Sequence, residues 1–263
     1  MENEKLITKT VEIIKQAGEI ALRYYKNPFT GYDLKPDGSH VTIADKEIEI
    51  FIKSKLEEEF EGIVIGEEGN NNNLNLESEF IWAVDPIDGT HSYAMKLPGW
   101  CISIGLLKDK KPYFGLIYSP IFDELYYGGP DFGAFLNYSE INSCVFNRED
   151  LCKTDSICID SKSMRNISIK FPGKLRSFGS TALHLVFAAK SSVLAAHCGK
   201  VKIWDILGAV SICYASGLCV KYIDGEDLFF DYDILNGKPL KKDIIACPSK
   251  AFKILSQCFK EKK

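Results

Sequence analysis

The run FIWAVDPIDGT, residues 80–90, says more about this chain than any other stretch of its sequence. Its first five residues, 80–84, are apolar and predict a buried strand. Asp85 and Asp88 follow directly, so both carboxylates emerge at the same strand end, and Pro86 between them stiffens the turn. Oxygen ligands gathered in this way, without histidine or cysteine, favour Mg²⁺ over zinc or copper. Crowded carboxylates also repel one another strongly unless a cation lies nearby.

Two more acidic clusters occupy comparable positions. Glu67 and Glu68 follow the short apolar strand 63–65, and Asp205 follows Trp204 at the start of a predicted helix. Each cluster alone is more typical of a helix cap or a solvated strand end than of a binding site. The combination of three such clusters predicts a shared cation site.

Gly89 and Thr90 begin a short helical stretch that runs towards Ala94. The backbone N–H groups and the dipole of such a stretch attract an anion, here beside the expected cations. Phosphate-monoester hydrolysis needs an acceleration of the order of 10²¹, whereas one general acid or base supplies about 10²–10⁴. Metal-activated water and charge neutralisation supply much of the difference in known enzymes. The pattern therefore indicates phosphoryl chemistry.

The rest of the chain alternates helices and strands. Helical spacing or composition predicts helices at 2–26, 44–60, 180–190, 205–216 and 249–260. Strands at 101–107, 113–118 and 124–127 read as an antiparallel meander, and further strands are expected at 156–160, 193–197, 218–222 and 244–246. Residues 35–39 and 69–75 are expected to be exposed loops, the first of them mobile. Strands bracketed by helices imply sheets covered by helices in several layers.

Composition indicates a soluble globular protein. The chain has 263 residues, of which 46% are hydrophobic and 26% charged, with a net charge of −4. We expect a single catalytic domain over 1–263, with sub-lobes at about 1–150 (metal and phosphate motifs) and 151–263 (substrate side). The negative net charge argues against a surface that binds nucleic acid, and no stretch of the sequence predicts a membrane span or a secretory signal. The nine cysteines include no C-x-x-C pair. We interpret most of them as core residues of a protein in a reducing compartment, the cytoplasm.

Three motifs together resemble one known family. Gly66-Glu67-Glu68, the run 82–90 and the run 204–209 (WDILGA) are similar to the signature motifs of the inositol monophosphatase superfamily, in the same order and approximate spacing. The resemblance implies an α/β fold, the layered αβαβα sandwich also found in fructose-1,6-bisphosphatases. It further implies a cytoplasmic, lithium-sensitive, Mg²⁺-dependent phosphatase of small metabolites, usually a homodimer.

The resemblance also implies a ligand set. One Mg²⁺ would be held by Glu67, Asp85 and the carbonyl of Ile87. A second would be held by Asp85, Asp88 and Asp205, and a third, weaker ion has a place near Glu67.

Catalytic roles follow from the same resemblance. Thr90 matches the residue that orients the attacking water, Asp45 matches its helix-borne partner, and Glu67 takes part beside them. Asp88, Gly89 and Thr90 would contact the phosphate. Lys35 matches a mobile active-site lysine, whereas Glu68 is equally typical of an outer ligand and of a solvent-facing residue.

The substrate side departs from the inositol pattern. Gly179, Ser180 and Thr181 align with the stretch that contacts the organic part of the substrate. Cys198 stands where inositol-type enzymes place a glutamate that binds a ring hydroxyl, which weakens the inositol assignment. Nearby Lys200 and Lys202 are compatible with a second phosphate, although short-loop lysines are more often solvated.

Three functions remain open from the sequence. The first is hydrolysis of inositol phosphate or another sugar or polyol phosphate. The second is hydrolysis of fructose bisphosphate, histidinol phosphate or a 3′-phosphoadenosine nucleotide. The third is a regulatory scaffold associated with protein or RNA, against which the intact carboxylates and the acidic charge balance argue.

Overall fold

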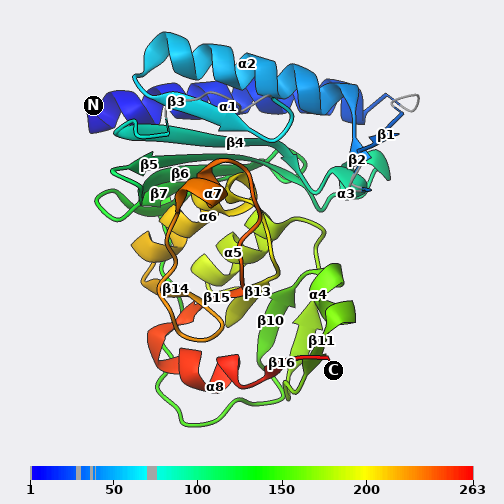
Figure 1. Ribbon diagram of the computed structural model, residues 1–263, viewed down its shortest axis with the longest axis vertical. Helices are drawn as coiled ribbons and strands as arrows, with labels where there is room; N and C mark the ends of the chain where they lie inside the picture. The colour runs from blue at the N-terminus through cyan, green and yellow to red at the C-terminus, as the bar shows by residue number, and fades with distance from the viewer. Residues whose placement is uncertain (1, 28–30, 36–37, 39, 70–75, 263) are drawn as a thin grey trace.

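The computed structural model describes residues 2–27, 31–35, 38, 40–69 and 76–262 and arranges them in five layers (Figure 1). Helices α1 (Asn3–Tyr25) and α2 (Ile43–Glu59) form the first layer and cover a seven-stranded sheet. Helices α5 (Thr181–Ala189) and α6 (Ile203–Ala215) lie between this sheet and a five-stranded one. Short helices α4 (Ser161–Asn166) and α8 (Phe252–Ser256) lie beyond the second sheet. The predicted αβαβα sandwich is confirmed.

The first sheet contains the predicted antiparallel meander. Its order is β3-β4-β5-β6-β7-β8-β9, and only the β3–β4 pair is parallel. The strands are β3 (Ile63–Gly66), β4 (Phe80–Asp88), β5 (Cys101–Lys108), β6 (Lys111–Ser119), β7 (Glu124–Gly129), β8 (Gly133–Leu136) and β9 (Ser139–Glu140). Strand β4 continues through Asp88, four residues beyond the apolar run that predicts it.

The second sheet is mixed. Its order is β12-β10-β13-β15-β14, with β12, β10 and β13 parallel and the other two pairs antiparallel. The strands are β10 (Ser156–Ile159), β12 (Lys174–Arg176), β13 (Ala195–Cys198), β14 (Leu218–Tyr222) and β15 (Ile244–Pro248). Strand β14 lies at an edge of this sheet.

Helix α6 packs unusually closely on the first sheet because glycines face one another. A Cβ atom added to Gly115 in β6 would lie 2.0 Å from the carbonyl oxygen of Gly208 in α6. A Cβ atom on Gly208 would lie 2.6 Å from the carbonyl oxygen of Ile104 in β5. This close approach sets the position of the first turn of α6, which carries Asp205.

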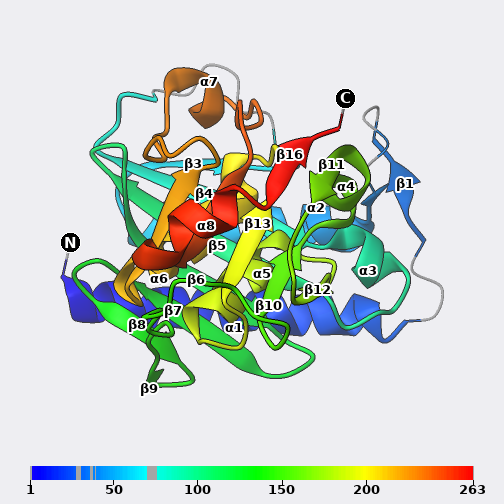
Figure 2. The same ribbon diagram turned by 90° about the horizontal axis from the view of Figure 1, so that it is seen from below.

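One predicted helix is wrong in its extent. The segment 249–260 forms a 3₁₀ turn, η1 (Ser249–Ala251), and then helix α8. Strand β16 (Phe259–Glu261) follows and pairs with β11 (Ile167–Ile169), as Figure 2 shows. A distant partner strand therefore decides the conformation of the last residues, which local spacing cannot reveal.

The remaining described elements are short. They are β1 (Asp33–Leu34) and β2 (His40–Val41), which pair with each other, and helices α3 (Thr90–Ala94) and α7 (Tyr232–Leu235). Most of the predicted loops at 35–39 and 69–75 lies outside the described residues. Within the described ranges, no helix has the length and apolar character needed to cross a membrane.

Candidate active site

Two carboxylates of the site come from the last part of β4. Asp85 and Asp88 are buried, with exposed fractions of 2% and 8%. Residues three apart in a regular strand point to opposite faces of the sheet. The pairing of β4 with β5 shifts its register between Asp85 and Asp88, where Pro86 lies. This irregularity explains how Asp85 and Asp88 can interact electrostatically at the same end of β4.

Glu67 and Asp205 join this pair from two other elements. Glu67 follows β3, and Asp205 lies in the first turn of α6. Burial raises the pKa of Asp85 well above its usual value, and the charges of Glu67, Asp88 and Asp205 raise it further. Burial, Glu67 and Asp88 raise the pKa of Asp205 in the same way. The structure thus brings all four proposed acidic ligands into one electrostatic cluster.

Asp85, Asp88 and the half-buried Asp205 also accept hydrogen bonds from neighbouring protein groups. Asp85 Oδ1 accepts a hydrogen bond from the N–H of Ile87 at 3.0 Å, and Asp205 Oδ2 accepts one from the N–H of Lys202 at 2.8 Å. Asp88 Oδ2 accepts hydrogen bonds from Ser180 and Ala182. Among the described residues, no three acidic, histidine or cysteine side chains close around a common point. The donor set nevertheless fits a hard divalent cation, because its members are oxygens whose buried negative charges repel one another.

Thr90 and Asp45 form the contact expected of them. The hydroxyl oxygen of Thr90 lies 3.2 Å from Asp45 Oδ1 and 2.9 Å from the carbonyl oxygen of Ile87. Asp45 is fully buried in the first turn of α2, where its other oxygen accepts hydrogen bonds from the backbone and hydroxyl of Thr42. Burial is the main cause that raises the pKa of Asp45 to about 7.

Lys35 lies against two of the carboxylates. Its ammonium nitrogen is 2.8 Å from Glu67 Oε1 and also contacts Glu68, and only 17% of its side chain is exposed. Burial opposes the charge of Lys35, but the two glutamates raise its pKa overall. The expectation of an exposed loop is therefore wrong for this residue. Glu68 is paired as well and has a side chain that is 9% exposed, so it does not face solvent.

Glu49 is a buried carboxylate that sequence reasoning missed. It lies one helical turn after Asp45 in α2, is 5% exposed and accepts a hydrogen bond from the N–H of Glu68 at 2.7 Å. Burial raises its pKa to about 6. Its spacing of four from Asp45, on the face that carries Ile48 and Ile52, is the signal that could have identified it.

The segment 177–181 lies against the turn at Gly89 through close glycine contacts. A Cβ atom on Gly89 would lie 2.7 Å from the carbonyl oxygen of Gly99, and one on Gly99 would lie 1.7 Å from that of Phe178. Gly89 and Gly179 both have a positive φ, at +95° and +90°, which favours glycine. Ser180, the N-cap of α5, then donates its hydroxyl to Asp88 at 2.6 Å.

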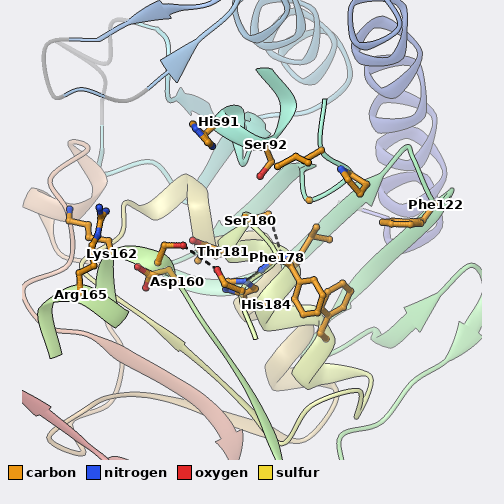
Figure 3. Close-up of a pocket in the computed structure, with 18 residues that line it drawn as sticks. His91, Ser92, Phe122, Asp160, Lys162, Arg165, Phe178, Ser180, Thr181 and His184 are labelled. Carbon is orange, nitrogen blue, oxygen red and sulfur yellow. Dashed lines mark hydrogen bonds between the residues drawn. The ribbon is translucent and has the colours of Figure 1, made fainter. Parts of the chain in front are cut away.

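A cavity of about 990 Å³ opens beside this contact (Figure 3). Gly179, Ser180 and Thr181 line it together with His184 of α5. Lys162 and Arg165, both on α4, lie on the side of the cavity next to Asp160 (Figure 3). These two cations were not singled out from the sequence, because an exposed lysine and arginine carry no local signal of a site.

Cys198 has a different environment. It is 2% exposed at the end of β13 and packs in the hydrophobic core, and it does not line the cavity. Lys200 lines two smaller cavities, and the ammonium of Lys202 lies over the ring of Trp204.

Comparison with known proteins shows the family of this chain. The model of the inositol monophosphatase family matches residues 2–258. The chain belongs to this family. It is 34% identical to inositol monophosphatase 3 of Solanum lycopersicum, over 81% of this chain and 84% of the relative. It is 29% identical to a fructose-1,6-bisphosphatase/inositol-1-monophosphatase of Aquifex aeolicus, over 96% and 98% of the two chains.

Solved structures give the same result for the fold. The crystal structure of the extragenic suppressor protein suhB from Bartonella henselae superposes with a TM-score of 0.81 and 25% identity, covering 96% of this chain and 97% of the other. The chain is thus a phosphoric monoester hydrolase of the inositol monophosphatase family, whose members use divalent metal ions.

Proposed function

We propose that this family member hydrolyses a small phosphate monoester with the aid of Mg²⁺. Glu67, Asp85, Asp88, Asp205 and the carbonyl of Ile87 would hold two ions, with a third, weaker ion near Glu67. The observation that carries the proposal is the raised pKa of Asp85 and Asp205, which is caused first by burial and then by the negative charges of the neighbouring carboxylates. When bound, the ions would lower the pKa of a coordinated water and neutralise charge on the phosphate.

The protein's own residues would position the reactants. The Thr90 hydroxyl has one proton, for which Asp45 and Ile87 offer acceptors, so its lone pairs remain available to orient a water molecule. Gly89 and Thr90 start α3, and the first N–H groups of a helix have no acceptor within that helix. These groups are therefore suited to bind the phosphate oxygens. Lys35, already beside Glu67, can add a positive charge at the same place.

The experiment that tests this function is phosphate release from a panel of substrates. The panel contains inositol 1-phosphate, fructose 1,6-bisphosphate, histidinol phosphate and a 3′-phosphoadenosine nucleotide, each with Mg²⁺, with excess chelator and with added Li⁺. We expect turnover that needs Mg²⁺ and falls with Li⁺. Undiminished release in excess chelator would refute the metal-dependent mechanism.

A substrate with a second anionic group is a further candidate. Lys162 and Arg165 offer two positive charges at the cavity beside Ser180, and the Aquifex aeolicus relative is named for a bisphosphate as well as for inositol phosphate. Lys162→Ala should raise KM for a bisphosphate about tenfold, because a hydrogen bond to a charged group contributes about 1.5 kcal/mol. KM for a monophosphate should hardly change, and Lys174→Ala on the exposed edge strand β12 is the matched control. Equal effects on both substrates would refute this role.

We also infer that the protein is a cytoplasmic homodimer. Exposed Leu97, Phe122 and Phe178 border the cavity and provide apolar surface that a second copy could cover. Sedimentation velocity of the purified protein tests the inference, and a monomer at micromolar concentration would contradict it.

A further inference from the structure

Two cysteines face each other on neighbouring strands of the second sheet. Cys219 in edge strand β14 is the register partner of Cys247 in β15, and their sulfur atoms are 4.0 Å apart. Both pack against the core cluster on the outer side of this sheet, and a third cysteine, Cys144, packs against the same cluster. The proposed function uses none of these thiols.

The geometry of the pair is suitable for a disulfide. Residues directly opposite in an antiparallel pair have Cα atoms about 4.5–5.5 Å apart, which lies within the range of disulfide-bonded cysteines. Their side chains also leave the sheet on the same face. Rotation of the two side chains therefore suffices to bring the sulfur atoms together, without movement of either strand.

The two thiols differ in access and in acidity. Cys219 is half-buried on the edge strand, whereas Cys247 is fully buried. The Cys247 thiol is the main cause of a lowered pKa of Cys219, and the Ser249 hydroxyl and the Lys221 ammonium act in the same direction. In its protonated form, the Cys219 thiol donates a hydrogen bond to the carbonyl oxygen of Cys247 at 3.2 Å. Contact with Cys219 and burial raise the pKa of Cys247. Nucleophilic attack on an oxidant should therefore begin at Cys219.

We propose that Cys219 and Cys247 form a reversible dithiol–disulfide pair that reacts with a peroxide. The Cys219 thiolate attacks one peroxide oxygen, the O–O bond breaks, and the leaving oxygen takes up a proton and departs as water or an alcohol. The Cys219 sulfenic acid that results is attacked by the Cys247 sulfur. The S–S bond forms, the S–O bond breaks, and the oxygen leaves as water with the Cys247 proton. Two thiols lose two electrons in total, and the peroxide gains them.

This pair is separate from the phosphatase site. It lies on the outer face of the second sheet, whereas Cys198 and Asp205 belong to the side that packs with α5 and α6. Oxidation should therefore leave phosphate release within about twofold of the reduced protein, a change of less than about 0.5 kcal/mol. Failure of the redox proposal can thus be distinguished from failure of the proposed function.

The test is peptide mapping of the full-length protein after treatment with hydrogen peroxide and alkylation of the remaining thiols. Trypsin should release residues 203–221 joined to residues 243–250, with a mass lower by two hydrogen atoms than the separate peptides together. Dithiothreitol should separate them again. Cys213 shares the first peptide with Cys219, so Cys219→Ser must abolish the joined product and leave Cys247 open to alkylation after denaturation.

Cys258→Ser is the matched control. Cys258 is buried, burial raises its pKa, and it lies outside the β14–β15 pair, so this variant should form the joined peptide like the wild type. Circular dichroism confirms the fold of both variants, and Cys219→Ala replaces Cys219→Ser if the latter fails to fold. Recovery of Cys219 and Cys247 as separately alkylated peptides, at a peroxide concentration that oxidises the half-buried Cys152, would overturn the proposal. Over-oxidised Cys219 without the joined peptide would overturn it as well.

Discussion

Asp88 connects the two halves of the candidate site through one carboxylate. It belongs to β4 of the first sheet, yet its Oδ2 accepts hydrogen bonds from Ser180 and the N–H of Ala182 at the start of α5, both at 2.6 Å. Burial raises the pKa of Asp88 to about 6, and these hydrogen bonds limit the rise. A single residue thus aligns the start of α5, which is proposed to contact the substrate, with the end of β4, which is proposed to hold the metal ions.

Asp85 should be the most sensitive carboxylate, since it is proposed to serve two ions. Asp85→Asn is expected to abolish turnover while the protein stays folded, whereas Asp205→Asn should be partly restored by extra Mg²⁺. Thr90→Ala should lower kcat about 10²-fold with little change in the Mg²⁺ requirement, because the role proposed for Thr90 is to orient water. The measurement is kcat against Mg²⁺ concentration, with circular dichroism and with exposed Asp227→Asn as the control. A folded Asp85→Asn protein with near wild-type rate would refute the two-ion assignment.

His184 should make stability depend on pH. It is 1% exposed, its Nε2 accepts a hydrogen bond from the N–H of Phe178, and burial lowers its pKa to about 4 although Asp160 opposes the shift. Between pH 6.5 and pH 4, His184 binds a proton in the unfolded chain but not in the folded protein. The free energy of unfolding therefore falls as the pH falls. The loss should reach about 3 kcal/mol.

Urea unfolding at several pH values tests this prediction in the wild type and in His184→Gln, which keeps an acceptor for Phe178. The variant should lose less stability over the same window, since glutamine does not titrate. Parallel pH profiles for the two proteins would show that His184 is not responsible.

At the scale of elements, α6 depends on glycine for its place. Gly208 lets the helix backbone approach β5 and β6 within a distance that no side chain allows. Asp205, one turn earlier in the same helix, is positioned by this contact. Packing of this element and geometry of the site are therefore coupled.

Gly208→Ala should destabilise the protein by about 2–4 kcal/mol, because the added methyl group overlaps backbone atoms that cannot rotate away. Helix propensity alone would favour alanine by about 1 kcal/mol. Chemical unfolding gives the free energy, and the Mg²⁺ requirement should rise as Asp205 moves. Gly31→Ala, at a position with open space around it, is the control. A variant as stable as wild type would contradict the close packing described for α6.

At the scale of the whole molecule, cation binding and stability should be linked. Asp45, with a pKa of about 7, and Asp88, with a pKa of about 6, retain protons in the metal-free fold at pH values where the unfolded chain has lost them. The stability that these two protonated carboxyl groups contribute to the fold is complete below the ordinary pKa of 3.8. It is lost as the pH rises through 6 and 7. Mg²⁺ would take the place of these protons.

Thermal unfolding should therefore respond to Mg²⁺ most at high pH. In excess chelator, Tm is expected to fall from about pH 6.5 to about pH 8, a range in which His184 stays neutral. Saturating Mg²⁺ should raise Tm by about 5 °C at the upper end and less at the lower end. Ca²⁺-free and K⁺-matched buffers exclude a general salt effect. Identical Tm values with chelator and Mg²⁺ at about pH 8 would argue against a cation site among these carboxylates.

The sequence by itself determined the local elements and the family. Apolar runs and helical spacing predicted α1, α2, α5 and α6 to within one or two residues of their ends, and the meander from β5 to β7. These features depend on neighbours within a few positions along the chain, so their signal is local. The motif at 82–90 identified the family for the same reason, because its residues are contiguous.

Only the tertiary structure decided which distant residues meet. Strand β16 forms because β11, some ninety positions away, offers its edge. Lys35 is paired with Glu67, Glu49 with the backbone of Glu68, and Cys219 with Cys247. These contacts depend on how layers stack and how strands align, and the free energy of such packing is spread over the whole core. No single stretch of sequence can therefore reveal them.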